Sequence, residues 1–401
     1  MAEQVIEHDT HAEVGPLAGF AAEAARLHTL YQQGRLEEVV AAVEAQRANL
    51  VDLPAAEQST VPWTVREAIL GVGVAAAHDL GHWEQALELN AGVRQSQEDR
   101  HAGDVEQAVT SFNDYAPLLR QGRGLEAKEL LYRCRAVFAG AEDLTMMGNT
   151  LSALADTDSH LGHRASAIDQ ETDALRLKYQ GSDPEAIAVS HYNLANYLIK
   201  AGQDLRAVWA HRLAAAVIRY QTNSSRFTTS LQSISRLVGH SGGVPVQAPL
   251  SFNDICSTVD SLAGVRFAEL FGLLPDRIEG GQSTVDEIMK LTTDMRDAAI
   301  EESIAAWEPI ISAMVATADK DANAEAGRLL DDALAELEKQ HPWRELVFVL
   351  TRIQAGPDHH SEQTVDNLDP VSSAVARRAR AALAGEVNVD PTAWQALTDE
   401  A

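Results

Sequence analysis

Histidine pairs are the side chains of this chain whose type and spacing come closest to a chemical site. His78 and His82 lie four residues apart, and His160 and His163 lie three apart. Histidines at these spacings on one face of a helix can bind a metal ion. Each pair, however, flanks or straddles a glycine that we expect to end a helix, so neither pair should keep helical geometry. The sequence therefore predicts no metal site.

The remaining polar clusters are also poorly arranged for catalysis. Asp156 and Asp158 lie two residues apart in one expected helix, which points their carboxylates to different faces and disfavours paired acid–base work. His359 and His360 fall in a polar loop. The chain carries no phosphate-binding loop, dinucleotide fingerprint, HExxH motif or GxSxG elbow. We accordingly predict a protein that is not an enzyme and needs no cofactor.

Composition limits the classes of partner and the compartment. The 401 residues include 59 acidic and 32 basic side chains, a formal net charge of −27, which opposes binding to nucleic acid and to anionic membranes. Cys134 and Cys256 suggest no disulfide framework. No apolar run approaches the roughly 18 residues of a membrane span, and residues 1–15 lack the features of a secretory signal. We expect a cytoplasmic protein.

A repeated pattern organises the first half of the chain. Glycines recur at 34, 81, 122, 162 and 202, at spacings of 47, 41, 40 and 40 residues. A small or apolar residue follows each glycine by five positions: Val39, Ala86, Ala127, Ala167 and Ala207. Eight positions before the last four glycines stand Gly73, Asp114, Leu154 and Leu194, of which Asp114 departs from the pattern, and Leu27 lies seven positions before Gly34. The columns predict antiparallel helix pairs that turn at glycine and must stack to bury their apolar faces.

These columns resemble the tetratricopeptide repeat, a helix-turn-helix unit of about 34 residues. The longer period resembles the kinesin-light-chain-like subclass. Asn193-Leu194-Ala195 matches its signature, and Gly181-Ser182-Asp183-Pro184 resembles the linker before it. The resemblance covers roughly residues 18–221, and the style of the whole chain is similar to high-GC bacterial regulatory and scaffold proteins. It implies an all-α, right-handed tetratricopeptide-type α-solenoid followed by a C-terminal helical module.

The chain is expected to fall into five segments. They are a flexible acidic N-terminal tail over 1–16, five repeats plus a capping helix over 17–240, a loop over 241–251, a helical C-terminal module over 252–389 and a tail over 390–401. Within the second half, apolar spacing predicts helices at 227–238, on both sides of Gly264 within 252–275, and at 283–300, 303–318, 322–340, 343–353 and 371–384.

The resemblance also implies a binding surface, because the first helix of each tetratricopeptide repeat lines the concave side. The residues placed there are Tyr192, Asn196 and Lys200 from the fifth repeat, Asn149, Ser152 and Asp156 from the fourth, and Phe112 and Arg120 from the third. An asparagine can pair its amide with a peptide backbone, and an aromatic ring can hold a side chain. Arg120 and Lys200 are the basic residues expected to meet a peptide carboxylate.

We therefore expect a non-enzymatic scaffold or adaptor that binds another protein or an extended peptide. One alternative is a peptide-responsive intracellular regulator or sensor, although residues 1–16 are too short for the helix-turn-helix that promoter-binding receptors usually carry. The third possibility is an enzyme within the C-terminal module, which lacks any nucleophile–base or metal constellation. The sequence does not identify the partner.

Overall fold

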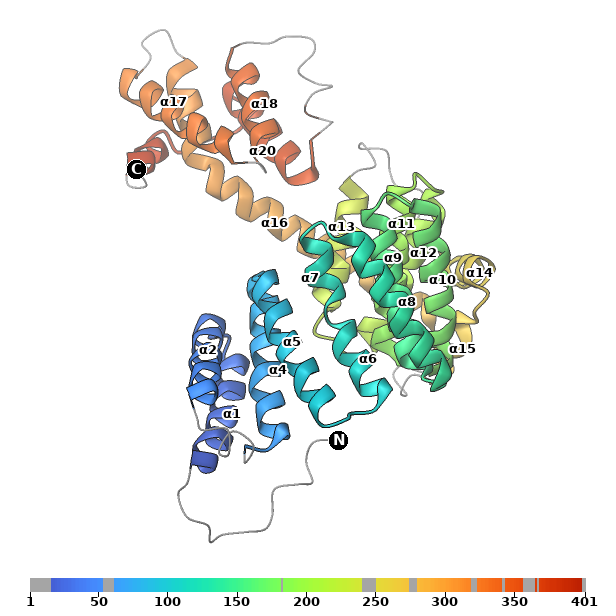
Figure 1. The fold of residues 1–401 in the computed structure, drawn as a ribbon. Helices are drawn as coiled ribbons and strands as arrows, with labels where there is room; N and C mark the ends of the chain where they lie inside the picture. Colours follow the sequence, from blue (N-terminus) through green and yellow to red (C-terminus); the bar gives the residue numbers. More distant parts are fainter. Residues whose placement is uncertain are drawn as a thin grey trace. The chain divides into compact units, whose positions relative to one another are not determined.

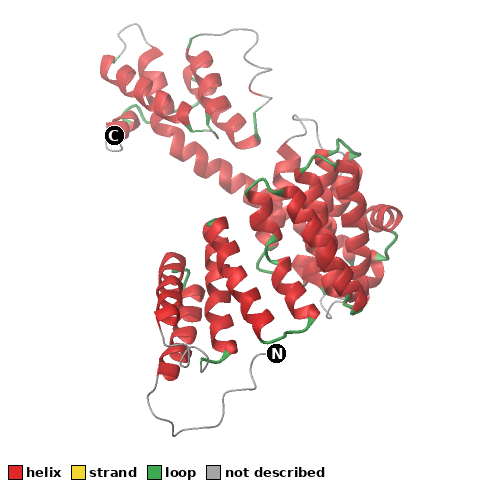
Figure 2. Ribbon diagram, in the orientation of Figure 1, coloured by secondary structure: helices red, strands yellow, loops and turns green. Residues whose placement is uncertain are grey.

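The computed structural model describes residues 16–52, 61–181, 183–239, 250–273, 280–318, 323–340, 343–355, 365 and 368–398. Within these ranges every regular element is a helix and no strand occurs (Figure 2). The all-α fold class predicted from the sequence is confirmed at this level. The expected N-terminal tail and most of the 241–251 loop lie outside the described residues.

Two compact units divide the chain, one formed by 1–183 and 196–202 and the other by 184–195 and 203–401. The first contains α1 Pro16–Gln32, α2 Leu36–Asp52, α4 Trp63–Leu80, α5 Trp83–Asp99, α6 Asp104–Phe112, α7 Tyr115–Arg120, α8 Gly124–Gly140, α9 Leu144–His160, α10 Arg164–Gly181 and the end of α11 Pro184–Lys200 (Figure 1). The second contains the start of α11, α12 Leu205–Gln221, α13 Phe227–Gly239, α14 Phe252–Ala263, α15 Phe267–Leu273, α16 Gly281–Ala318, α17 Ala324–Lys339, α18 Arg344–Gln354, α20 Pro370–Leu383 and the 3₁₀-helix η1 Ala393–Thr398.

All five predicted turn glycines lie between helices in the left-handed conformation. Their φ values run from +66° to +83°, a region that residues with a Cβ atom rarely adopt. The column five residues later is buried throughout, as the sequence predicts. Gly73 shows why one position needs glycine, since a Cβ there would lie 2.8 Å from Cγ1 of Val43, whereas its neighbour Gly71 faces open space.

The third repeat differs from the single first helix that the sequence predicts. The chain forms α6 and α7 separately, with Asn113 and Asp114 bonding back by three residues, to the carbonyls of Thr110 and Ser111. Pro117 explains the break, because it has no N–H to donate to the Asn113 carbonyl and its ring crowds that turn. The break between α6 and α7 determines where the candidate site lies.

The C-terminal module is tied together by one long helix. The sequence predicts two helices, 283–300 and 303–318, but α16 is continuous over Gly281–Ala318 because no glycine or proline separates them and Pro309 is accommodated within the helix. Its buried C-terminal residues, Trp307 to Met314, share a core with α17, α18 and α20. Part of the predicted 390–401 tail also packs here, since Trp394 is buried and Ser312 Oγ donates to the Asp390 carbonyl at 2.7 Å.

A buried histidine pair joins α11 to α12 in the second unit. The Nδ1 atoms of His191 and His211 are 2.8 Å apart, and the edge of Phe267 packs on His191 with ring centroids 5.8 Å apart. Burial lowers the pKa of both imidazoles, that of His211 to about 4, and the proximity of His211 lowers that of His191 further. The folded protein therefore holds both rings neutral.

Substitution of a turn glycine tests the repeat register. No atom lies within 4 Å of the position that a Cβ would take at Gly202, so a side chain would meet no clash there and would be strained only by the φ of +66°. Gly202→Val should lower the free energy of unfolding by about 1–3 kcal/mol in urea titrations. Gly202→Asn is the matched control and should cost clearly less, because asparagine tolerates the left-handed region. Equal stability of the valine variant and wild type would refute the register.

The histidine pair predicts acid sensitivity. A histidine of the unfolded chain titrates near pH 6.5. Below about that pH the unfolded chain binds protons that the buried pair of the folded protein does not bind, which favours unfolding. The contribution of the pair to stability should be complete above that pH and be lost as the pH falls towards about 4, the pKa of His211 in the fold. Urea titrations across this range should show a weaker pH dependence for His211→Leu. The exposed control His28→Gln should keep the wild-type dependence, and an unchanged dependence in His211→Leu would contradict the assignment.

Candidate functional site

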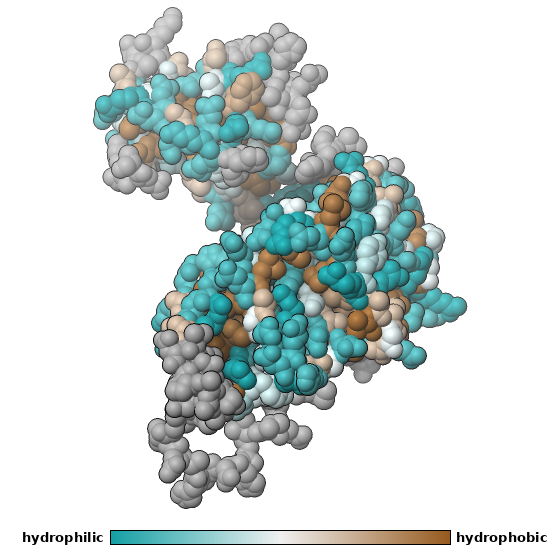
Figure 3. Space-filling view, in the orientation of Figure 1, coloured by the Kyte–Doolittle hydropathy of each residue, from teal (hydrophilic) through white to brown (hydrophobic). Residues whose placement is uncertain are grey.

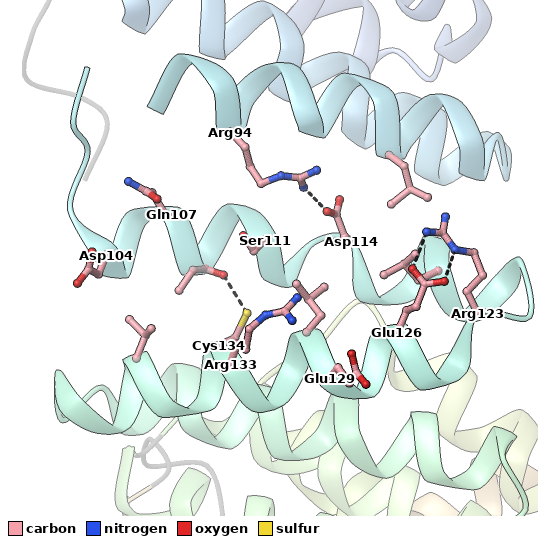
Figure 4. A pocket seen from close by; sticks show the side chains of 15 residues that line it. Arg94, Asp104, Gln107, Ser111, Asp114, Arg123, Glu126, Glu129, Arg133 and Cys134 are labelled. Atoms are coloured by element: carbon pink, nitrogen blue, oxygen red, sulfur yellow. Dashed lines mark hydrogen bonds and ion pairs between the residues drawn. The ribbon is translucent and has the colours of Figure 1, made fainter. Parts of the chain in front are cut away.

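A polar cleft of about 620 Å³ lies in the first unit and is lined by α5, α6, α7 and α8, with the α6–α7 segment running between α5 and α8 (Figure 4). We call it the Asp114 cleft. Its lining residues are Leu87, Arg94, Asp104, Gln107, Ala108, Ser111, Asp114, Leu118, Arg123, Glu126, Glu129, Leu130, Arg133, Cys134 and Val137. The break between α6 and α7 places Asp114 among these lining residues. In an unbroken helix its side chain would point in another direction.

Asp114 occupies the column that holds Leu154 and Leu194 in the next two helix pairs, and it is buried there. Its carboxylate accepts a hydrogen bond from Asn90 Nδ2 at 2.7 Å and pairs with Arg94, both from α5. Asn90 Nδ2 also donates to the Thr110 carbonyl at 2.8 Å, at the end of α6. A polar residue in an apolar column is thus satisfied by partners from the preceding helix.

Burial raises the pKa of the Asp114 carboxyl above its usual value, while the Asn90 hydrogen bond and the Arg94 charge act in the opposite direction. The Arg94 side chain remains 30 % exposed, so its guanidinium faces the cleft while it holds Asp114. The pair therefore fixes the floor of the cleft and leaves donor capacity on Arg94.

The walls carry charges of both signs. Arg123 pairs with Glu126 at 2.7 Å, and both are about half exposed, so this pair contributes little to stability. Asp104, Glu129 and Arg133 are exposed and form no ion pair or side-chain hydrogen bond with the described residues. These three side chains offer one donor group and two acceptor groups around an apolar strip formed by Leu118, Leu130 and Val137.

Cys134 lies at the base of the cleft. Its Sγ donates to the Ala108 carbonyl at 3.5 Å, and burial raises the pKa of the thiol to about 11. The thiol is therefore protonated at neutral pH, which disfavours a nucleophilic role. Its position is that of a small packing residue, as the column pattern predicts.

One of the residues predicted on α9, Ser152, is engaged with the neighbouring helix α10. Ser152 Oγ donates to Glu171 Oε1 at 3.0 Å and accepts from Lys178 Nζ at 2.8 Å, both on α10. Burial lowers the pKa of Lys178, although the nearby Glu171 carboxylate favours its charged form. Gly148 makes room for the lysine, since a Cβ there would lie 3.2 Å from Lys178 Cγ. Ser152 thus takes part in an internal network.

Other predicted residues remain accessible on α9 and at the end of α11. Asn149 is half-buried, with Nδ2 4.0 Å from the sulfur of Met146, and Asp156 lies 3.3 Å from His160. Lys200 Nζ donates to Ser159 Oγ at 3.0 Å, so the structure brings the end of α11 beside the end of α9. Asn196 is half-buried on the same last turns of α11.

The three remaining predicted residues lie in different surroundings. Phe112 is half-buried against Tyr115, with ring centroids 5.2 Å apart, and Arg120 is exposed at the end of α7. Tyr192, in the second unit, is covered by the guanidinium of Arg212 at 4.1 Å from the ring centroid. None of the eight predicted residues lines the Asp114 cleft. The signals for the cleft in the sequence were Asp114 as the exception in its column and Pro117 as the helix breaker.

In the pair formed by His160 and His163, each histidine contacts a different carboxylate. His160 lies 3.3 Å from Asp156 and His163 3.2 Å from Asp158, which also accepts from Lys128 at 2.5 Å. Among the described residues, no three histidine, cysteine, aspartate or glutamate side chains are grouped so that they could hold a metal ion. His359 and His360 lie outside the described residues.

Comparison with known proteins adds no relative: no protein-family model matches the chain, and no curated protein matches its sequence. Within the described ranges no helix has the length and apolar character needed to cross a bilayer.

Removing the Asp114 carboxylate tests the floor of the cleft. Asp114→Ala leaves the Asn90 amide with one acceptor fewer in a buried position, and Arg94 without its partner. The free energy of unfolding should fall by about 1–3 kcal/mol. The decrease should be near the lower end of this range if the Arg94 guanidinium rotates into solvent. Glu126→Ala removes a carboxylate from an exposed pair in the same cleft and should leave the denaturation curve unchanged. Equal effects of the two substitutions would show that Asp114 is not the structural anchor.

Proposed function

We propose that this chain is a non-enzymatic scaffold of the tetratricopeptide type that binds a peptide segment of a partner protein in the Asp114 cleft. The repeated helix pairs support this proposal. Five left-handed glycines and a buried column behind them recur at a period near 40 residues, which favours stacked, solenoid-like packing. Proteins built this way present extended surfaces to partners.

The observation that carries the proposal is the chemistry of the cleft walls. Arg133 and Glu129 of α8 and Asp104 of α6 line the cleft, none of them paired with another described side chain. A guanidinium suits a carboxylate or backbone carbonyls, and a carboxylate suits a lysine, an arginine or backbone N–H groups. The strip formed by Leu118, Leu130 and Val137 suits an apolar side chain between them. A peptide segment of mixed charge with one apolar anchor meets all three requirements.

The charge of the chain and the buried groups of the cleft disfavour other ligands and activities. The net charge of −27 disfavours nucleic acid and anionic lipid as partners. Asp114 is held by Asn90 and Arg94, and the Cys134 thiol stays protonated, so neither of these buried groups is available as a general base or a nucleophile. Binding without chemistry is the function that these side chains support best. A cytoplasmic location, as expected from the sequence, belongs to the same proposal.

Peptide selection on the whole chain provides the test. A random-peptide library displayed on phage, selected against the purified protein, should yield peptides that carry acidic and basic residues around an apolar one. Arg133→Ala should weaken the selected peptide by about tenfold, because a charge-assisted hydrogen bond contributes about 1.5–3 kcal/mol. The affinity is measured by isothermal titration.

Arg135→Ala is the matched control. Arg135 is exposed on the same helix two residues away, does not line the cleft, and has no ion pair among the described residues. It should bind the selected peptide as wild type does. Equal affinities of both variants and wild type would contradict the site. Weakening by Lys200→Ala or Asn149→Ala instead would move binding to the surface predicted from the sequence.

A further inference from the structure

A second, apolar hollow lies in the C-terminal module, in a part of the chain that the proposed function does not use. It encloses about 920 Å³ between α16, α17 and η1 and is bounded by Trp343 at the start of α18. We call it the Trp307 groove. Its lining residues are Ala306, Trp307, Pro309, Ile310, Leu329, Asp332, Ala333, Glu336, Leu337, Gln340, Trp343, Ala396 and Leu397. On the face of the C-terminal module that Figure 3 shows, at the top of the view, apolar residues lie among hydrophilic ones.

The floor of the groove is apolar and rigidly held. Trp307 is buried in the core shared by α16, α17, α18 and α20, and its ring meets that of Trp343 edge-on with centroids 5.5 Å apart. Leu329, Ala333 and Leu337 follow one another by four residues, so they form one stripe along α17. The groove therefore offers a line of apolar contacts about 12 Å long, the rise of eight helical residues.

The rim of the groove is acidic. Asp332, Glu336 and Gln340 also follow one another by four residues and form a second stripe beside the apolar one. Every charged residue that lines the groove is a carboxylate. Glu336 pairs with Lys339 at 2.6 Å, but both side chains are about two-thirds exposed, so water competes with this pair. Asp332 is exposed and has no ion pair or side-chain hydrogen bond with the described residues.

The whole of α17 has the same sign of charge. It carries five carboxylates and two cations, a net charge of −3: Glu325, Asp331, Asp332, Glu336 and Glu338 against Arg328 and Lys339. A partner that buries apolar side chains against Trp307 and Leu337 therefore does so next to a negative rim. Charge complementarity selects a partner with cations beside its apolar stripe.

We propose that the Trp307 groove is a docking site for a basic amphipathic helix of a partner protein. An apolar stripe and a charged stripe that share a four-residue period match a helix lying along α17, with leucine-like residues facing Leu329, Ala333 and Leu337. Its lysines or arginines lie over Asp332 and Glu336. This site differs from the Asp114 cleft in both chemistry and position in the chain, and its occupancy does not depend on the proposed function.

The test uses a designed probe and the whole chain. A fluorescein-labelled helical peptide of about four turns, with leucines on one stripe and lysines flanking them, is titrated by fluorescence anisotropy. A second peptide replaces each lysine with glutamate. The lysine peptide should bind at least tenfold more tightly than the glutamate peptide. Equal affinity, or no saturable binding of the lysine peptide, would overturn the proposal.

Two double variants of α17 locate the binding. Asp332→Lys with Glu336→Lys reverses the groove rim and should weaken the lysine peptide by at least tenfold. Asp331→Lys with Glu338→Lys changes the net charge equally, at exposed positions that do not line the groove, and should change the affinity less than threefold. Equal weakening by both variants would indicate attraction to the whole acidic surface and would overturn the docking site.

Ala333→Phe provides a measurement that does not depend on charge. A phenyl ring at this half-buried lining position occupies the groove and should abolish binding while the far-ultraviolet circular dichroism stays that of wild type. Retained binding in this folded variant would place the peptide elsewhere. Arg133→Ala, which alters only the Asp114 cleft, should bind the lysine peptide as wild type does.

Discussion

The left-handed turn glycine is the constraint on which the first unit depends. At Gly34, Gly81, Gly122 and Gly162 the chain reverses within a few residues, with φ between +74° and +83°, so that two helices run antiparallel in contact. The short turn fixes which faces meet, and the residue five positions later is then buried in every pair. A small or apolar side chain at that position lets the two helices of a pair pack closely.

Asp114 shows what happens when one position of this pattern changes. A carboxylate in a buried column requires hydrogen bonds, and Asn90 and Arg94 of the preceding helix provide them. Pro117 breaks the helix that carries Asp114, and the segment between α6 and α7 then borders a cleft instead of completing the packed layer. The candidate site thus arises where the residue pattern before the turn glycine changes locally.

The sequence predicted those features that depend on short-range patterns. The turn glycines, their buried column, the helix at 227–238 and the helix pair around Gly264 follow from residue types at fixed spacing, and the structure contains all of them. The α6–α7 break was also encoded locally, by Pro117, but the regularity of the other repeats concealed it. The continuity of α16 was missed because a polar stretch at 301–303 looks like a boundary when its neighbours are unknown.

Features that join distant segments were beyond sequence reasoning. The pairing of His191 with His211 and the covering of Tyr192 by Arg212 depend on which faces of α11 and α12 meet. Ser152 was predicted to face a ligand, yet it bonds Glu171 and Lys178, a choice made possible by Gly148. The Asp114 cleft is lined from four successive helices and the Trp307 groove from α16, α17 and η1, so no single motif indicates either one.

Hydrogen–deuterium exchange of the whole chain, with and without a saturating peptide selected on it, tests most directly where a partner binds. We predict slower amide exchange in α6, α7 and α8, over residues 104–140, with no change in α9 or in α16 to α18. Protection that appears instead along α9 and the end of α11, with residues 104–140 unaffected, would contradict the claim that the Asp114 cleft is the partner-binding site.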